Sequence, residues 1–141
     1  GNVSYDPANH QKMTNIREEK VQRIADFIPD QDIDQGPEEG DMLVLAWGST
    51  YGSCKAAVRD LLASGYSVAH AHLRHLKPFP KNLGEMMKRY RHVLVPEINN
   101  GQLVRLLRDE YLLDAVPYNK VQGVPIGRQE LVDFAKDILD Q

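Results

Sequence analysis

Residues that could carry chemistry gather in a few short stretches of this 141-residue chain. The first is GSTYGS, residues 48–53, which follows an apolar run and precedes a helical pattern. A glycine-rich turn in that position can hold a phosphate or a carboxylate against the free N–H groups of the next helix. This stretch matches neither GxGxxG nor GxxxxGK[ST], and it has no lysine to reach a terminal phosphate. We interpret it as a tight turn with Ser and Thr caps, with a docked anion as the alternative.

A single acidic residue, Glu97, ends another apolar run just before Asn99, Asn100 and Gly101. Catalytic carboxylates often lie at strand ends, but acid–base chemistry needs a partner group, and the sequence identifies none. We therefore prefer a helix-capping and hydrogen-bonding role for Glu97.

Three histidines, His70, His72 and His75, suggest a metal site at first sight. On a strand His70 and His72 would share one face, but His75 lies beyond the strand end, and no further ligand follows at metal-binding spacing. We interpret all three as packing or exposed side chains.

The single cysteine, Cys54, excludes an intrachain disulfide and an iron–sulfur cluster held by this chain's own thiolates. Because Cys54 is the first residue of an apolar stripe, we expect it to be buried.

The loop YNKVQG, residues 118–123, combines an aromatic residue, two amides and a cation. Turn chemistry does not require Lys120 or Gln122, because Gly123 and Pro125 already make the bend. Loops on a rigid scaffold commonly carry binding groups. We predict that Lys120 is exposed and pairs with a carboxylate or phosphate of a neighbouring domain or subunit.

Alternating strands and helices must position these stretches. Apolar runs predict strands over residues 42–47, 67–73, 92–97 and 114–118. An apolar stripe at helical spacing follows each of them, and Asn82 with Glu85 three residues later resembles a capping box. Four strands alternating with four helices predict right-handed crossovers, and hence a three-layer α/β/α fold with a mainly parallel sheet.

In such a fold every loop from a strand to the next helix lies at the carboxyl edge of the sheet, where open α/β folds bind ligands. These loops hold most of the chain's Gly, Pro and amide residues. We predict a ligand or partner face at this edge, with ordinary turn chemistry as the alternative. Its candidate residues are Gly48, Ser49, Thr50, Lys77, Glu97, Asn99, Asn100, Tyr118, Asn119, Lys120 and Gln122.

The first 41 residues form a separate region. Asp6-Pro7 marks a helix start, and apolar residues at helical spacing predict a helix from about Ala8 to Ile28. Residues 29–41 hold six acidic residues and no basic one, so we expect a solvated linker that does not order itself. The chain then divides into an N-terminal helix with an acidic linker over residues 1–41 and one α/β domain over residues 42–141.

The net charge of -3, with Lys and Arg scattered along the chain, gives no electrostatic footprint for nucleic acid. Neither a membrane-spanning run nor a signal-peptide pattern is found, so no membrane partner is expected and a cytoplasmic location fits. The chain begins at Gly1 inside a polar phrase, and we expect it to belong to something longer.

Five phrases resemble the C-terminal part of the alpha subunit of 2-oxoacid:ferredoxin oxidoreductases, most closely those that act on 2-oxoglutarate. In order, they are SYDPANHQKM (4–13), LAWGSTYG (45–52), HLRHLKPFPKNLGE (72–85), LVPEINNGQLVRLLRDEY (94–111) and YNKVQGVPI (118–126). The resemblance runs nearly end to end and is loosest in the acidic segment. It implies a transketolase C-terminal-like domain, whose fold would add an antiparallel edge strand that the sequence pattern does not locate.

The resemblance also implies a function, the oxidative decarboxylation of 2-oxoglutarate to succinyl-CoA with coenzyme A and ferredoxin. Thiamine diphosphate, magnesium and an iron–sulfur cluster would belong to the preceding pyrimidine-type domain of the alpha subunit and to the beta subunit. No catalytic or cofactor-binding residue carries over onto this chain, so we expect an isolated chain that is inactive and serves interdomain and subunit packing. The alternative is an independent flavodoxin-like module that binds an anionic ligand at the Gly48 and Asn99 loops.

Overall fold

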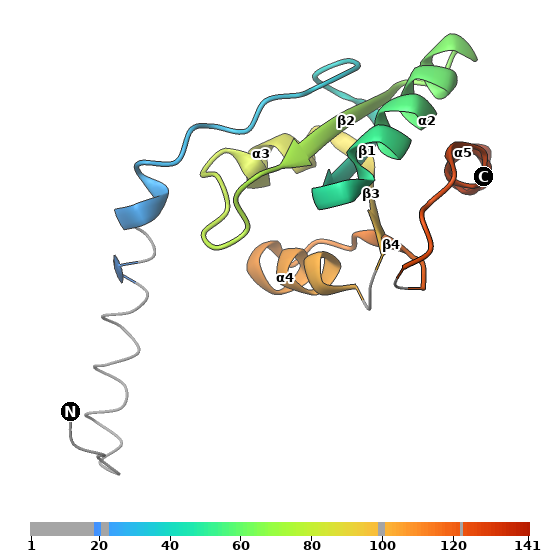
Figure 1. Ribbon diagram of the computed structural model, residues 1–141. Coiled ribbons are helices and arrows are strands. Elements are labelled where there is room, and N and C mark those ends of the chain that lie inside the picture. Colours follow the sequence, from blue (N-terminus) through green and yellow to red (C-terminus); the bar gives the residue numbers. More distant parts are fainter. Residues whose placement is uncertain (1–18, 21–22, 99–100, 122) are drawn as a thin grey trace.

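A computed structural model describes residues 19–20, 23–98, 101–121 and 123–141 (Figure 1). Most of the predicted helix from Ala8 to Ile28 lies outside these ranges. Within them, Glu19, Lys20 and residues 23–25 are helical.

Four parallel strands form one sheet in the order β2-β1-β3-β4. Their bounds are β1 Gly40–Trp47, β2 Val68–Leu73, β3 Tyr90–Glu97 and β4 Val116–Asn119. The register places Met42 of β1 beside Val68 of β2 and His92 of β3. Strands covered on both faces read as continuous apolar runs, which is why the sequence identifies them. The predicted parallel sheet is confirmed.

Helices cover both faces of the sheet. On one face α2 (Tyr51–Ala63) and α5 (Arg128–Leu139) pack on Met42 and Val44. On the other face α3 (Leu83–Lys88) and α4 (Gln102–Tyr111) pack on Leu43 and Leu45. Successive residues of β1 therefore point into different cores, as the pleat of a strand requires. The three layers are seen in Figure 1, and the predicted α/β/α fold class is confirmed.

The acidic segment 29–41 does not behave as the predicted unordered linker. Asp34 and Gln35 donate backbone hydrogen bonds to the carbonyl of His70 (2.8 and 3.2 Å), and His70 N–H donates to Gln35 O (2.8 Å). This is an antiparallel bridge on the outer edge of β2. The Asp34 carboxylate also accepts from His72 N–H (2.7 Å), and Ile33 packs against the core. The prediction of a linker was wrong because it considered apolar burial alone, whereas an open strand edge offers unpaired backbone groups.

The described residues form no antiparallel edge strand of the kind that the resemblance implies, and Gln35 with His70 makes only an isolated antiparallel bridge there. The boundary between regions at residue 41 stays a prediction.

The predicted capping box at Asn82 is absent, because its side chain is used elsewhere. Asn82 is the N-cap of α3 but makes no side-chain cap hydrogen bond. Its Oδ1 accepts from Gln31 N–H (2.7 Å), and its Nδ2 donates to Gln31 O (2.8 Å). Asn82 thus fixes the start of the acidic segment.

We predict that Gly36→Ala releases the acidic segment from β2. Gly36 has φ +91°, and a Cβ there would lie 2.3 Å from Val68 O and 2.8 Å from Ala69 Cα. A left-handed non-glycine residue alone costs about 1–3 kcal/mol. Urea denaturation should therefore show a lower free energy of unfolding, and hydrogen exchange should show loss of protection at Gln35 N–H.

Gly52→Ala is the matched control, since Gly52 lies in α2 without a positive φ, and a Cβ there would meet nothing within 4 Å. It should be neutral or stabilise by up to about 1 kcal/mol. Equal effects of the two substitutions would contradict the docking of this segment.

Candidate functional site

The carboxyl ends of β1 and β3 meet where the strand order reverses, the place at which open α/β sheets bind ligands. A pocket of about 210 Å³ lies there. Its lining residues are Trp47, Gly48, Ser49, Thr50, Glu97 and Ile98. The structure thus brings together two of the loops that the sequence singles out.

Glu97 is 1% exposed, and its carboxylate is hydrogen-bonded on both oxygens. Oε1 accepts from Trp47 Nε1–H (3.1 Å) and from Leu103 N–H (2.8 Å), and Oε2 accepts from Val104 N–H (3.3 Å). Leu103 and Val104 lie in the first turn of α4, whose N–H groups have no partner inside the helix. The positive end of the helix dipole also favours a carboxylate there. The preferred capping and hydrogen-bonding role is confirmed.

One side chain of the Gly48 turn and one of β2 hold the turn. Gly48 (φ +66°) begins the 3-10 helix η1 (Gly48–Thr50), which leads directly into α2. The Thr50 hydroxyl donates to Trp47 O (2.9 Å), and His72 Nε2 lies 3.0 Å from Gly48 O, where its N–H donates. The interpretation as a tight turn is confirmed, but the predicted Ser and Thr caps are not: Thr50 is the N-cap of α2 without a side-chain cap hydrogen bond, and Ser49 is exposed beside the pocket.

His70 and His72 are buried, and both rings lie against the ring of Tyr51. The Tyr51 ring centroid lies 5.6 Å from that of His70 and 5.0 Å from that of His72. His75 is exposed, and the described residues contain no group of three or more potential metal ligands. Among the described residues neither ring nitrogen of His70 has a hydrogen-bond partner, and burial lowers the pKa of His70 to about 4. The packing interpretation is confirmed for the buried pair.

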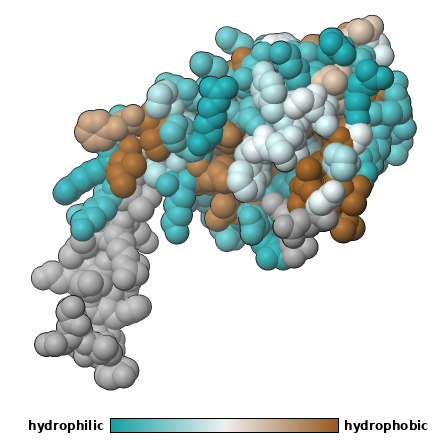
Figure 2. Space-filling model, in the orientation of Figure 1, coloured by the Kyte–Doolittle hydropathy of each residue, from teal (hydrophilic) through white to brown (hydrophobic). Residues whose placement is uncertain are grey.

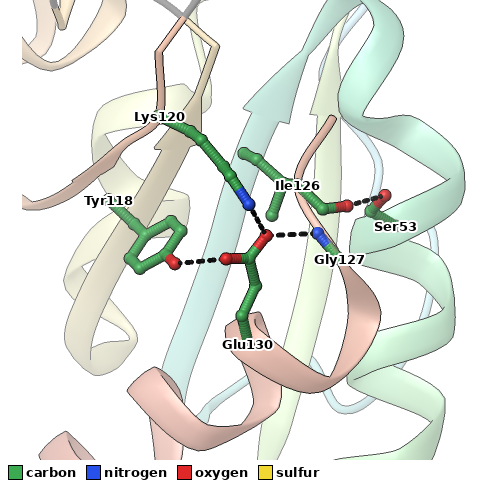
Figure 3. A network of polar contacts seen from close by, with 6 residues as sticks. All are labelled: Ser53, Tyr118, Lys120, Ile126, Gly127 and Glu130. Atoms are coloured by element: carbon green, nitrogen blue, oxygen red, sulfur yellow. Dashed lines mark hydrogen bonds and ion pairs between the residues drawn. The ribbon is translucent and has the colours of Figure 1, made fainter. Parts of the chain in front are cut away.

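A second polar cluster joins β4, the following loop and α5 around Glu130 (Figure 3). Lys120 Nζ and Gly127 N–H each donate to Glu130 Oε1 at 2.5 Å, and the Tyr118 hydroxyl donates to Oε2 at 2.9 Å. Lys120 first, then the Gly127 N–H and Tyr118, lower the pKa of the Glu130 carboxyl to about 2. The Ser53 hydroxyl of α2 donates to Ile126 O (2.6 Å), which ties the end of the loop to the neighbouring helix.

This cluster corrects the prediction for Lys120. Its partner is a carboxylate of the same chain, and its side chain is only 27% exposed. The error arose because Glu130 lies in a different element, ten residues further on. Glu130 is the third residue of α5 and bonds back to the N-cap Gly127, which is one half of a capping box. The Gly-x-x-Glu spacing was therefore the available signal, whereas no sequence signal pairs Ser53 with Ile126 or Trp47 with Glu97.

The remaining predicted site residues are dispersed. Lys77 is exposed in the loop after β2, outside both the pocket and the Glu130 cluster. The Asn119 side chain packs over Gly101 (φ +80°), where a Cβ would lie 3.1 Å from Asn119 Nδ2. Asn99, Asn100 and Gln122 lie outside the described residues.

Cys54 is fully buried, as expected, and burial raises the pKa of its thiol to about 12 against an opposing hydrogen bond with Thr50. A thiol held in its protonated form is neither a nucleophile nor a metal ligand at neutral pH. None of the helices in the described part of the chain has the length and apolar character needed to cross a membrane.

These observations define a three-layer, parallel α/β domain whose carboxyl-edge carboxylates bind groups of the same chain. Comparison with known proteins identifies the family. The chain belongs to the pyruvate:ferredoxin oxidoreductase core domain II family, whose model matches residues 40–130.

Comparison with individual proteins gives the same result. The chain is 42% identical over 139 residues to the 2-oxoglutarate oxidoreductase subunit KorA of Mycobacterium tuberculosis, a match that covers 99% of this chain and 21% of the relative. It is 30% identical to a solved 2-oxoglutarate:ferredoxin oxidoreductase from Magnetococcus marinus, with a TM-score of 0.81 over 97% of this chain and 24% of that one. That structure holds 2-oxoglutarate, coenzyme A and succinyl-CoA.

A split-gene transketolase shares the fold alone, with 18% identity and a TM-score of 0.61 over 78% of this chain and 41% of that one. The chain spans only about a fifth of the length of the curated relatives that it matches.

We predict that His70 makes the chain less stable as the pH falls from about 6.5 to about 4. In this interval the unfolded chain binds a proton at His70 that the folded chain does not, so the free energy of unfolding decreases with falling pH. The loss approaches roughly 3 kcal/mol, at about 1.4 kcal/mol for each pH unit. His70→Leu should flatten the pH dependence measured by urea denaturation, whereas the same change at exposed His75 should leave it intact. An unchanged slope in His70→Leu would contradict this assignment.

We also predict that Lys120→Glu lowers the melting temperature of the isolated chain. The substitution removes Lys120, the main cause of the low pKa of Glu130, and places a second carboxylate beside Glu130, so that like charges replace an ion pair. Lys77→Glu makes the same charge change at an exposed position and should stay within about 0.5 kcal/mol of wild type. Calorimetry that finds equal melting temperatures for both variants would show that the Glu130 cluster contributes nothing to stability.

Proposed function

We propose that this chain is the C-terminal domain of the alpha subunit of a 2-oxoacid:ferredoxin oxidoreductase that converts 2-oxoglutarate to succinyl-CoA. The observation that carries this proposal is the 42% identity, across 99% of the chain, to a 2-oxoglutarate oxidoreductase subunit. Within that enzyme the domain is non-catalytic and serves the packing of neighbouring domains and of the beta subunit.

The polar groups of the described residues support a non-catalytic role. Both Glu97 oxygens accept N–H groups of the domain itself, and Glu130 is bonded by Lys120, Gly127 and Tyr118. A carboxylate committed to its own fold in this way has little freedom to exchange protons with a substrate.

The cysteine count and the phosphate motifs support a place outside this domain for the cofactors that the resemblance implies. An iron–sulfur cluster needs several thiolates, whereas the chain has one buried, protonated cysteine. Thiamine diphosphate and magnesium need a diphosphate cradle and oxygen ligands, and the Gly48 turn matches no phosphate motif. We therefore assign these groups to the preceding pyrimidine-type domain and the beta subunit, with ferredoxin and coenzyme A as partners of the complete enzyme.

The pocket at the β1–β3 crevice favours a second candidate function. An independent α/β module could bind a small anion there, beside the Gly48 turn and the start of α2, while Asn99, the other residue of this hypothesis, lies outside the described residues. Thermal-shift measurements of the isolated chain with coenzyme A, flavin mononucleotide and nucleotides separate the two functions, because only a binding module is stabilised by its ligand.

The proposed function is tested in the complete enzyme with Ser49→Ala, which removes the exposed hydroxyl beside the pocket. We expect the complete complex to reduce ferredoxin with 2-oxoglutarate and coenzyme A, and the variant to retain kcat and KM because the domain is non-catalytic. The isolated chain should show no turnover. A tenfold or larger loss of kcat in Ser49→Ala, about 1.4 kcal/mol in the barrier, or turnover by the isolated chain, would contradict the proposal.

A further inference from the structure

The turn at residues 23–28 carries apolar side chains on two of its sides. Its backbone hydrogen bonds run from Phe27 N to Ile24 O (3.0 Å) and from Ile28 N to Ala25 O (3.3 Å), a spacing at which side chains three residues apart lie over one another. The inner pair, Ala25 and Ile28, is buried or half-buried. The outer pair is exposed, with Ile24 54% and Phe27 88% accessible.

Polar contacts connect this turn and the segment after it to the body of the domain. Asp26 forms an ion pair with Lys81, and the segment that follows is bonded to Asn82 through Gln31. Beyond that, Gln35 joins the edge of β2. The outer pair is therefore kept at the surface by contacts made elsewhere, and Figure 2 shows apolar side chains exposed over this turn.

A short element that is apolar on more than one side is typical of a segment lying between two bodies. The α/β domain, which the turn contacts through the ion pair of Asp26 with Lys81, is one of these two bodies. The second is indicated by the extent of the matches: the family model begins at residue 40, whereas the match to KorA covers 99% of this chain but 21% of that relative. The turn thus lies outside the domain that the family model describes, in a stretch shared with a much longer subunit.

We propose that Ile24 and Phe27 dock into an apolar, uncharged pocket on the remainder of the complete alpha subunit. This inference rests on the proposed function, because it requires that subunit. An exposed phenylalanine on a fixed turn suits such a contact, since aromatic residues are enriched and charged residues depleted at the buried core of interfaces. Its fixed position also lowers the ordering cost of association.

Thiol labelling tests the contact directly. Ile24→Cys is introduced into the isolated chain and into the complete alpha subunit, and maleimide labelling is followed by mass spectrometry of the peptide that contains the new thiol. Water exclusion at a docked position should slow labelling about tenfold or more in the complete subunit. Adding Phe27→Ser should restore the rate of the isolated chain, because the main anchor is lost.

Ser64→Cys, at the exposed C-cap of α2, is the matched control and should react equally in both proteins. Equal rates for Ile24→Cys in both proteins would overturn the proposal. So would equal slowing of both cysteines, or slowing of the isolated chain with rising concentration, which would indicate a second copy instead. Labelling does not depend on turnover, so a complete subunit whose complex is inactive with 2-oxoglutarate would count against the proposed function and not against the docking.

Discussion

Glu97 connects the three elements that define the carboxyl edge of this domain. It is the last residue of β3, it accepts a hydrogen bond from Trp47 at the end of β1, and it caps the first turn of α4. A buried carboxylate without partners would cost several kcal/mol, so these three donors make the arrangement possible. Glu97 also lines the pocket at this edge, and these contacts already occupy both oxygens of its carboxylate. The position at which an α/β enzyme often places a catalytic acid is here part of the architecture.

Two further carboxylates join segments of the chain by hydrogen bonds, as Glu97 does, at the sides of the sheet. Glu130 joins the end of β4 to the first turn of α5, and Asp34 joins the acidic segment to β2 through His72 N–H. Each carboxylate accepts at least one backbone N–H from a helix terminus or a strand, where the backbone has spare donors. Hydrogen bonds with a charged acceptor are stronger than neutral ones. Three acidic side chains can therefore hold the start of α4, the start of α5 and the acidic segment against the sheet.

The elements themselves could be predicted from the sequence. A strand buried on both faces, such as 42–47, is a continuous apolar run, and a helix buried on one side, such as α5, has an apolar stripe. The order β2-β1-β3-β4 could not, since periodicity identifies strands but not their neighbours. The acidic segment was predicted wrongly for a related reason: its contacts with β2 are hydrogen bonds, which leave no apolar pattern. For Lys120, residue type alone suggested a partner outside the chain, and only the fold brings Glu130 within 2.5 Å.

The edges of the sheet bear on how such a domain can associate. The free edge of β2 is partly closed by the chain's own residues near Gln35, which limits strand addition on that side. At the carboxyl edge, the side chains of Glu97 and Glu130 have hydrogen-bond or ion-pair partners within the domain. These two carboxylates are therefore poorly available for charge pairing with a partner, and shape and apolar side chains are the other means of recognition. The exposed Ile24 and Phe27 supply such side chains on a turn whose position is set by the same segment that closes the β2 edge.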